Sequence, residues 1–105
     1  GVVHLSNMLR TNQTLTWLWL TGNQISSSGV ESLSHTLTDS NTTLEWLFLS
    51  ANPMIDDRCV DILLHMIKRN QSLKTLYINN CNLSEPARRS LLKIIKTRHD
   101  FDLEV

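Results

Sequence analysis

The sequence predicts an α/β solenoid of about three strand–turn–helix repeats, each 29 residues long, with a parallel concave sheet and helices on the outside. Two observations predict this fold. Leucine-rich segments recur at a fixed interval, and within each unit the spacing of apolar residues changes from every second residue to every third or fourth. The chain has 105 residues, a length that suits one domain. We therefore expect a single domain over residues 1–105.

Three short segments show the repeat most clearly: "LTWLWL" at 15–20, "LEWLFL" at 44–49 and "LKTLYI" at 73–78. Their alternating apolar residues predict short strands with one buried face, and the strands of successive units are expected to pair in parallel. Other positions repeat at the same interval and extend the pattern through each unit. These columns are Asn12, Asn41 and Asn70; Ile25, Met54 and Leu83; Leu33, Ile62 and Leu91; and Leu37, Met66 and Ile95.

A helix is expected in the second half of each unit, because residues that favour helix starts stand before the helical spacing. These residues are Ser26–Ser28 in the first unit, Asp56 and Asp57 in the second, and Ser84 with Pro86 in the third. The predicted repeats are 15–43, 44–72 and 73–101.

The two ends of the chain differ. Residues 1–14 carry a helical stripe without a strand before it, which predicts the helical half of a preceding repeat and favours a fragment. Residues 101–105 alternate apolar and acidic side chains, which predicts a closing strand whose charges discourage edge pairing. We therefore expect the C-terminal end of a longer array. A short standalone or engineered repeat protein is the alternative.

One polar column follows the strands: Asn23, Asn52 and Cys81. A buried asparagine at this position can satisfy unpaired backbone groups of the neighbouring coil. We expect the column to form a structural ladder of hydrogen bonds along the array, with Cys81 as a weaker donor.

The segments "LTWLWLTGNQI", "LEWLFLSANPM" and "LKTLYINNCNL" resemble the leucine-rich repeat signature L-x-x-L-x-L-x-x-N/C-x-L. The long helical half, "GVESLSHTLTDSNTTL", resembles the ribonuclease-inhibitor-like subclass. That subclass includes the C-terminal arrays of NOD-like (NLR) receptors, ribonuclease inhibitor and the Ran GTPase activators. The resemblance covers nearly the whole chain and implies the fold. It does not imply one function, because every matching position is structural.

Aromatic residues occupy the strand positions that point away from the leucines. If the leucines face inward, adjacent strands about 4.8 Å apart place the rings side by side on the concave face. The rings then either stack on one another without a ligand, or form a contact surface. The contact would be with a protein or peptide, with a second copy or another part of the parent chain, or with a carbohydrate or other small ligand. The candidate partner-binding residues are Trp17, Trp19, Trp46, Phe48 and Tyr77, with Thr21, Ser50 and Asn79 as a polar rim.

Catalysis, metal binding and cofactor binding are not expected. The histidines His4, His35, His65 and His99 have no metal-ligand spacing, and the sequence holds no glycine-rich phosphate loop. The sequons at Asn12, Asn41, Asn70 and Asn82 are weak evidence for glycosylation, because three of them share one repeat column. "RRSLLKIIKTR" is interpreted as core plus solvated charge, and we expect neither a membrane nor a nucleic-acid partner.

Charge distribution and cysteine content bear on the partner and the location of the protein. Residues 1–57 hold one basic and five acidic residues, whereas 58–105 hold nine basic and five acidic ones. This asymmetry is either incidental or indicates that the basic end docks an acidic partner. Two cysteines, Cys59 and Cys81, do not make a disulfide framework, so we expect a reducing, cytoplasmic location.

The function expected from these features is ligand recognition. We expect a protein-interaction module, in the C-terminal part of a larger cytoplasmic innate-immune-type receptor, that binds through the concave aromatic face. Two alternatives stay open: regulation of an enzyme, as ribonuclease inhibitor or a GTPase activator does, and a structural capping or self-association module.

Overall fold

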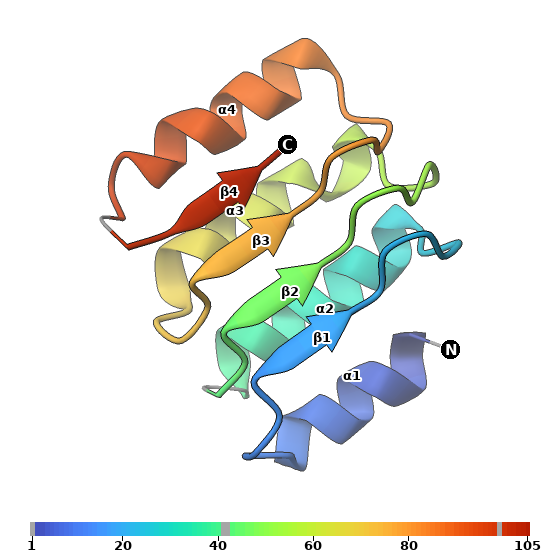
Figure 1. Ribbon diagram of the computed structural model, residues 1–105, viewed down its shortest axis with the longest axis vertical. Helices are drawn as coiled ribbons and strands as arrows, with labels where there is room; N and C mark the ends of the chain where they lie inside the picture. Colours follow the sequence, from blue (N-terminus) through green and yellow to red (C-terminus); the bar gives the residue numbers. More distant parts are fainter. Residues whose placement is uncertain (1, 41–42, 99) are drawn as a thin grey trace.

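The computed structural model describes residues 2–40, 43–98 and 100–105, and these residues form a two-layer solenoid segment (Figure 1). Helices and strands alternate along the chain. In order they are α1 (Val2–Thr11), β1 (Trp17–Trp19), α2 (Ser27–Asp39), β2 (Trp46–Phe48), the 3₁₀ turn η1 (Asp57–Cys59), α3 (Val60–Arg69), β3 (Thr75–Tyr77), α4 (Glu85–Ile95) and β4 (Asp102–Glu104).

The strands form one parallel sheet in the order β1-β2-β3-β4. Leu18 pairs with Leu47, Leu47 with Leu76, and Leu76 with Leu103, so equivalent residues of successive coils lie side by side. This arrangement confirms the predicted α/β solenoid, and its 29-residue register holds for the first two strand pairs, whereas Leu76 and Leu103 are 27 residues apart. It also shows that the closing segment joins the sheet as a fourth parallel strand.

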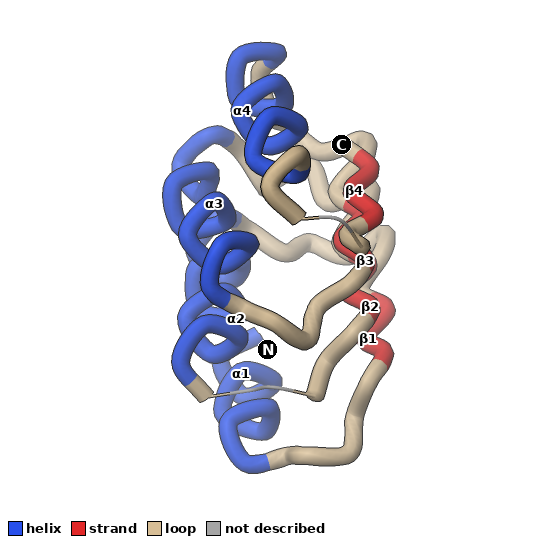
Figure 2. Tube along the Cα trace, turned by 90° about the vertical axis from the view of Figure 1, so that its left-hand side faces the viewer, coloured by secondary structure: helices blue, strands red, loops and turns tan. Residues whose placement is uncertain are grey.

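Helices and strands lie on opposite sides of the molecule (Figure 2). Buried leucines of both layers form the core. Leu47 and Leu76 on the strands, and Leu33 and Leu63 on the helices, have at most 1% of their surface exposed. Each coil alone could not cover these side chains. The core therefore depends on neighbouring coils stacking against each other. Among the described helices, none has both the length and the apolar character needed to cross a bilayer.

The second coil departs from the strict 29-residue alignment. Met54 was expected beside Ile25 and Leu83, but it is 53% exposed, and the buried residue is Ile55. Ile62 was expected beside Leu33, yet Leu63 occupies the fully buried position. The turn "ANPMI" holds one residue more than "GNQI", and Leu63 and Ile67 of α3 face the core. Met66, which was expected beside Leu37, is also fully buried, so that column is kept.

Polar side chains cap free backbone N–H groups at the start of α2, of α4 and of the 3₁₀ turn η1 that leads into α3. Ser26 Oγ accepts from the Gly29 N–H at 3.4 Å, and Ser84 Oγ accepts from the Ala87 N–H at 3.2 Å. Asp56 Oδ1 does the same for the Arg58 N–H at 3.1 Å. These caps confirm the helix starts predicted from the sequence.

A column of left-handed residues leads out of the strands. Gly22, Ala51 and Asn80 have φ angles of 75°, 58° and 55°. Glycine and asparagine adopt this conformation readily, whereas alanine does so at a cost of roughly 1–2 kcal/mol. The column turns each chain from the sheet toward its helix. Only Ala51 carries the conformational strain.

Candidate functional site: an aromatic face on the sheet

The side of the sheet turned away from the helices carries most of the aromatic residues. We call this surface the aromatic face and define it by Trp17, Trp19, Trp46, Phe48 and Tyr77. The strand register places Trp17 beside Trp46, and Trp19 beside Phe48, which in turn pairs with Tyr77. Trp17, Trp19 and Trp46 are 55%, 64% and 38% exposed. Such exposure is unusual for residues with this much apolar surface.

The rings of the aromatic face contact one another as well as solvent. Phe48 is central, because its ring centroid lies 5.9 Å from Trp17, 5.2 Å from Trp19 and 5.2 Å from Tyr77. The Trp17 and Trp19 rings are 6.1 Å apart. Pairs of this geometry stabilise a fold by about 0.5–1.5 kcal/mol each. Mutual stacking therefore explains part of the pattern, but it leaves the tryptophans exposed.

A shallow apolar hollow opens between Trp17, Trp46 and Phe48, with a volume of about 310 Å³. This volume is at the small end of ligand pockets and fits one apolar or long side chain. The hollow is built only of ring surface on two adjacent strands. It can receive a side chain by contact, but these three residues offer no catalytic group.

The predicted polar rim is partly occupied by contacts within the domain. Ser50 Oγ donates to Asn79 Oδ1 at 3.0 Å and accepts from the Asn79 N–H at 3.1 Å, which links two coils. Thr21 is half-buried at the equivalent position of the first coil. At the other end of the strands, Lys74 Nζ lies 3.1 Å from Glu45 Oε1.

The sheet face is not apolar throughout. Thr75 stands in the same outward row as Trp46, but it is only 8% exposed, because its short side chain lies between Trp46 and Asp102 on the neighbouring strands. Tyr77 donates its hydroxyl to Asp102 Oδ2 at 2.8 Å. This bond to the carboxylate raises the pKa of Tyr77. Asp102 and Glu104, both exposed, complete the face on β4.

Asp102 and Glu104 also belong to this surface, although the sequence did not predict them as part of it. The alternation in "FDLEV" predicted a strand, but the two acids were interpreted only as a protection against edge pairing. The alternation was the available signal, because it puts these two acids on the side of the strand opposite Phe101, Leu103 and Val105. The register with β3 then places them in the same two rows as the aromatic residues.

The predicted ladder positions differ from one another in the structure. Asn52 is fully buried and donates through Nδ2 to the carbonyls of Leu49 at 2.7 Å and Leu20 at 3.1 Å. Cys81 makes longer contacts, with Sγ 3.5 Å from the Leu49 carbonyl. Asn23 was expected to be buried but is exposed. It bonds within its own coil, because β1 lies at the edge of the described sheet.

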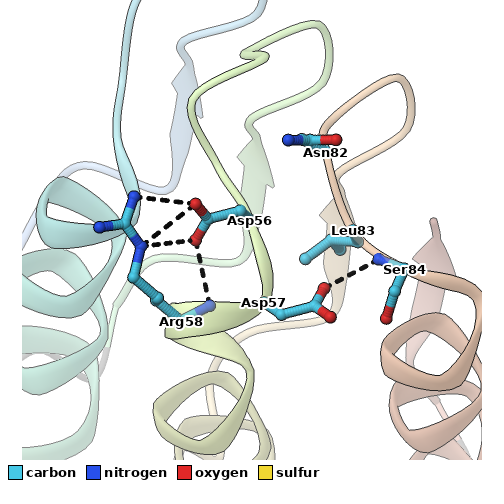
Figure 3. Close-up of a pocket in the computed structure, with 6 residues that line it drawn as sticks. All are labelled: Asp56, Asp57, Arg58, Asn82, Leu83 and Ser84. Atoms are coloured by element: carbon cyan, nitrogen blue, oxygen red, sulfur yellow. Dashed lines mark hydrogen bonds and ion pairs between the residues drawn. The ribbon is translucent and has the colours of Figure 1, made fainter.

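A second hollow, of about 400 Å³, lies where the second and third coils turn toward their helices (Figure 3). The carboxylates that line this hollow form hydrogen bonds within the domain. Arg58 donates to both carboxylate oxygens of Asp56, at 2.9–3.2 Å, and holds the pKa of Asp56 well below its usual range. Asp57 Oδ1 accepts from the Ser84 N–H at 2.8 Å, a bond that lowers its pKa. These carboxylates serve as caps and links between coils.

The remaining candidate residues do not assemble into a site. His4, His35 and His65 are exposed on helices, and His99 lies outside the described residues. In the described part of the chain, no three His, Cys, Asp or Glu residues are placed to hold a metal ion. Asn70 is 3% exposed, donates to the Leu37 carbonyl and accepts from the Leu73 N–H, so this sequon has a structural role. Asn41 also lies outside the described residues.

Comparison with known proteins agrees with this architecture. Family models described as "Leucine Rich repeat" and "Leucine Rich Repeat" match residues 11–34 and 72–93. The chain is a leucine-rich repeat protein. It is similar to the repeats of NLR receptors, since it is 35% identical over 92 residues to "NACHT, LRR and PYD domains-containing protein 3" of Bos taurus. That match covers 88% of the chain and 9% of the bovine protein.

Solved structures of the same fold are similar to the leucine-rich repeat domain over almost its whole length. "Leiomodin-1 Actin-Binding Site 2 (ABS2)" has a TM-score of 0.87 at 17% identity, and the match covers 98% of this chain and 60% of that one. The tropomodulin C-terminal domain of Caenorhabditis elegans has a TM-score of 0.83 at 19% identity, with 99% and 62% covered. At these identities the likeness shows the fold alone.

Proposed function

We propose that this leucine-rich repeat domain is a protein-interaction module that binds a protein or peptide partner through the aromatic face. One observation carries the proposal: three tryptophans on adjacent strands expose 55%, 64% and 38% of their surface on one side of the sheet. Tryptophan and tyrosine are favoured as interface anchors, because they bury a large area while few rotatable bonds are ordered.

The domain is further proposed to belong to a larger cytoplasmic receptor of the innate-immune type. The similarity to the bovine NACHT, LRR and PYD domains-containing protein supports this role, although the chain spans only 9% of that protein's length. The leiomodin-1 fragment is named as an actin-binding site, so a protein that contains this fold can serve in binding. Neither comparison supplies a catalytic group for this chain.

Affinity capture with paired variants tests the proposal. Trp17→Ala combined with Trp46→Ala removes two walls of the hollow, while Met54→Ala combined with Leu92→Ala removes two exposed apolar side chains elsewhere. The immobilised wild type and both variants are compared for the proteins that they retain from the same cell extract. Circular dichroism confirms that each variant is folded.

The proposal expects the tryptophan variant to lose the partners that the wild type retains. The control variant should keep them. If the tryptophan variant keeps the same partners at the same yield, the aromatic face is not the binding surface. Light scattering over a concentration series separates the self-association alternative, in which the wild type dimerises and the tryptophan variant does not.

A further inference from the structure

The sheet face carries an electrostatic asymmetry that runs across the strands. Its outward rows are aromatic on β1 and β2, mixed on β3, and acidic on β4, where Asp102 follows Thr75 and Glu104 follows Tyr77 in register. Both acids are exposed. Within the described strands the outward rows contain no basic residue. A partner that covers the whole face therefore meets apolar rings at one side and negative charge at the other.

The basic residues in the segments that lead into β3 and β4, Lys74 and Arg98, do not neutralise these acids. Lys74 pairs with Glu45 at 3.1 Å. Arg98 donates to the carbonyls of Ile67 at 2.8 Å and Leu73 at 3.0 Å, and its guanidinium lies 4.7 Å from the centre of the Phe101 ring. In the described part of the chain neither Asp102 nor Glu104 takes part in an ion pair.

Asp102 keeps one carboxylate oxygen for a partner. Its Oδ2 accepts from the Tyr77 hydroxyl at 2.8 Å, which orients the carboxylate at the border between rings and acids. Oδ1 has no hydrogen-bond partner in the described chain. A cation bound here touches a ring edge and a carboxylate at once. Lysine and arginine suit this border, because their methylene stems pack on apolar surface while the charged group reaches out.

The aromatic rings also favour a positively charged partner. An aromatic ring presents negative potential on its face and attracts ammonium and guanidinium groups, most strongly in tryptophan. Trp19 is the most exposed ring, at 64%, and it lies against Phe48 in the row that ends at Glu104. An acidic segment would instead face repulsion at β4. The aromatic and acidic parts of the face thus select the same class of partner.

The dimensions of the face match a short extended peptide. Four strands spaced about 4.8 Å apart place β4 roughly 14 Å from β1, and an extended chain advances about 3.3 Å per residue. A segment of four to five residues therefore spans from the hollow at Trp17 and Trp46 to the carboxylates of β4.

We infer that the sheet face recognises a basic peptide segment: an apolar side chain enters the hollow of Trp17, Trp46 and Phe48, and a lysine or arginine about four residues away reaches Asp102 and Glu104. This inference rests on the proposed function, because it names the partner class of the same face. The complementary charge at β4 is what commits the face to a cationic occupant.

A matched pair of peptides tests the inference. One is acetyl-Gly-Leu-Gly-Gly-Gly-Lys-Gly-Lys-Gly-amide, in which the first lysine follows the leucine by four residues and so lies on the same face of an extended chain. The other carries glutamate in place of both lysines. Each is titrated into the ¹⁵N-labelled domain, and the three indole N–H signals of the tryptophans report binding by NMR. The same titrations use Asp102→Asn with Glu104→Gln, and a control of equal charge change on the helices, Asp39→Asn with Asp61→Asn.

The inference expects the lysine peptide to shift the indole signals at concentrations where the glutamate peptide does not. Asp102→Asn with Glu104→Gln should weaken this binding about tenfold, whereas Asp39→Asn with Asp61→Asn should not change it. In the wild type, raising NaCl from about 0.05 to about 0.5 M should weaken it as well. The salt titration supplies the answer even if the acid variant does not fold.

Three outcomes would overturn the inference. Equal binding of both peptides would remove the cationic selection and leave the aromatic face as a general binding surface. Absence of any indole shift with either peptide would reject this partner class, while capture with the tryptophan variants would still decide the proposed function. Concentration-dependent indole shifts without peptide, lost in the Asp102→Asn and Glu104→Gln variant, would assign the cationic contact to a second copy.

Discussion

Asn52 joins two coils through Ile25: its Oδ1 accepts the Ile25 N–H at 3.1 Å, in a position where the Asn52 side chain is fully buried. The amide nitrogen of the same side chain donates to Leu20 in the preceding coil and to Leu49 in its own coil. One side chain thus satisfies backbone groups on both sides of a coil boundary.

Asn52→Ala should destabilise the domain strongly, by about 3 kcal/mol, because several buried backbone groups lose their partners. The matched control is Asn23→Ala in the same repeat column. Asn23 is exposed and bonds within its own coil, so its loss should cost less than about 1 kcal/mol. Urea unfolding of both variants measures the difference. Equal destabilisation would show that the Asn52 contacts do not carry the coil boundary.

Stability should fall in acid partly through Asp56. Hydrogen bonds from Arg58 first, and from Ser27 second, hold the pKa of Asp56 below its ordinary 3.8. A carboxylate with a lowered pKa stabilises the fold above its ordinary pKa, and this contribution is lost as the pH falls toward the lowered value.

Asp56→Asn should therefore be less stable than the wild type near neutral pH, and the gap should narrow below about pH 4. Urea unfolding of the two proteins at about pH 7, 5 and 3 provides the measurement, and the difference at neutral pH is the internal reference. A gap that stays constant or widens in acid would contradict the assigned contacts.

Ala51→Gly should stabilise the domain, although the change deletes a side chain. Ala51 has a φ of 58°, a left-handed conformation in which the alanine Cβ is crowded. Glycine relieves this strain but adds flexibility to the unfolded chain, so the net gain is about 0.5–1 kcal/mol. Ala87→Gly is the opposite control, because Ala87 is buried in α4, and there glycine should cost at least about 1 kcal/mol. Thermal unfolding distinguishes the two.

The two cysteines should resist alkylation in the folded domain. Burial raises the pKa of Cys59 to about 11 and also raises the pKa of Cys81, so little thiolate is present at mild pH. Iodoacetamide at about pH 8 should modify both slowly in buffer and quickly in denaturant. Mass spectrometry measures the extent at each cysteine. Rapid modification of Cys59 in buffer would contradict its buried position.

The repeat period was sufficient to predict the strands and their register. Leu18, Leu47 and Leu76 form the predicted row, because parallel strands of equal repeats pair equivalent residues. The period failed in the second turn, where Ile55 rather than Met54 is buried. The extra residue in this turn is compensated before the next strand, so the strand leucines keep their 29-residue interval. An alignment fixed on these leucines therefore does not show the shift.

The candidate surface was only partly predictable. Strand alternation placed Trp17, Trp46 and Phe48 on one face, but the hollow between them depends on ring rotamers that no periodicity encodes. Asp102 and Glu104 were not predicted to extend this surface, because the parallel pairing of β4 depends on how the last segment returns to the sheet. Gly22 and Asn80 could have been predicted as left-handed positions, because glycine and asparagine favour this conformation and the two residues occupy the same position of the repeat.

Site-specific photocrosslinking tests the binding face most directly. Trp46 is replaced by p-benzoylphenylalanine in one protein and Leu92, an exposed residue of α4, in another. After irradiation in cell extract, partner adducts are quantified by mass spectrometry. We expect partner adducts at position 46 and few at position 92. Equal or higher yield at position 92 would place the partner on the helices and contradict recognition through the aromatic face.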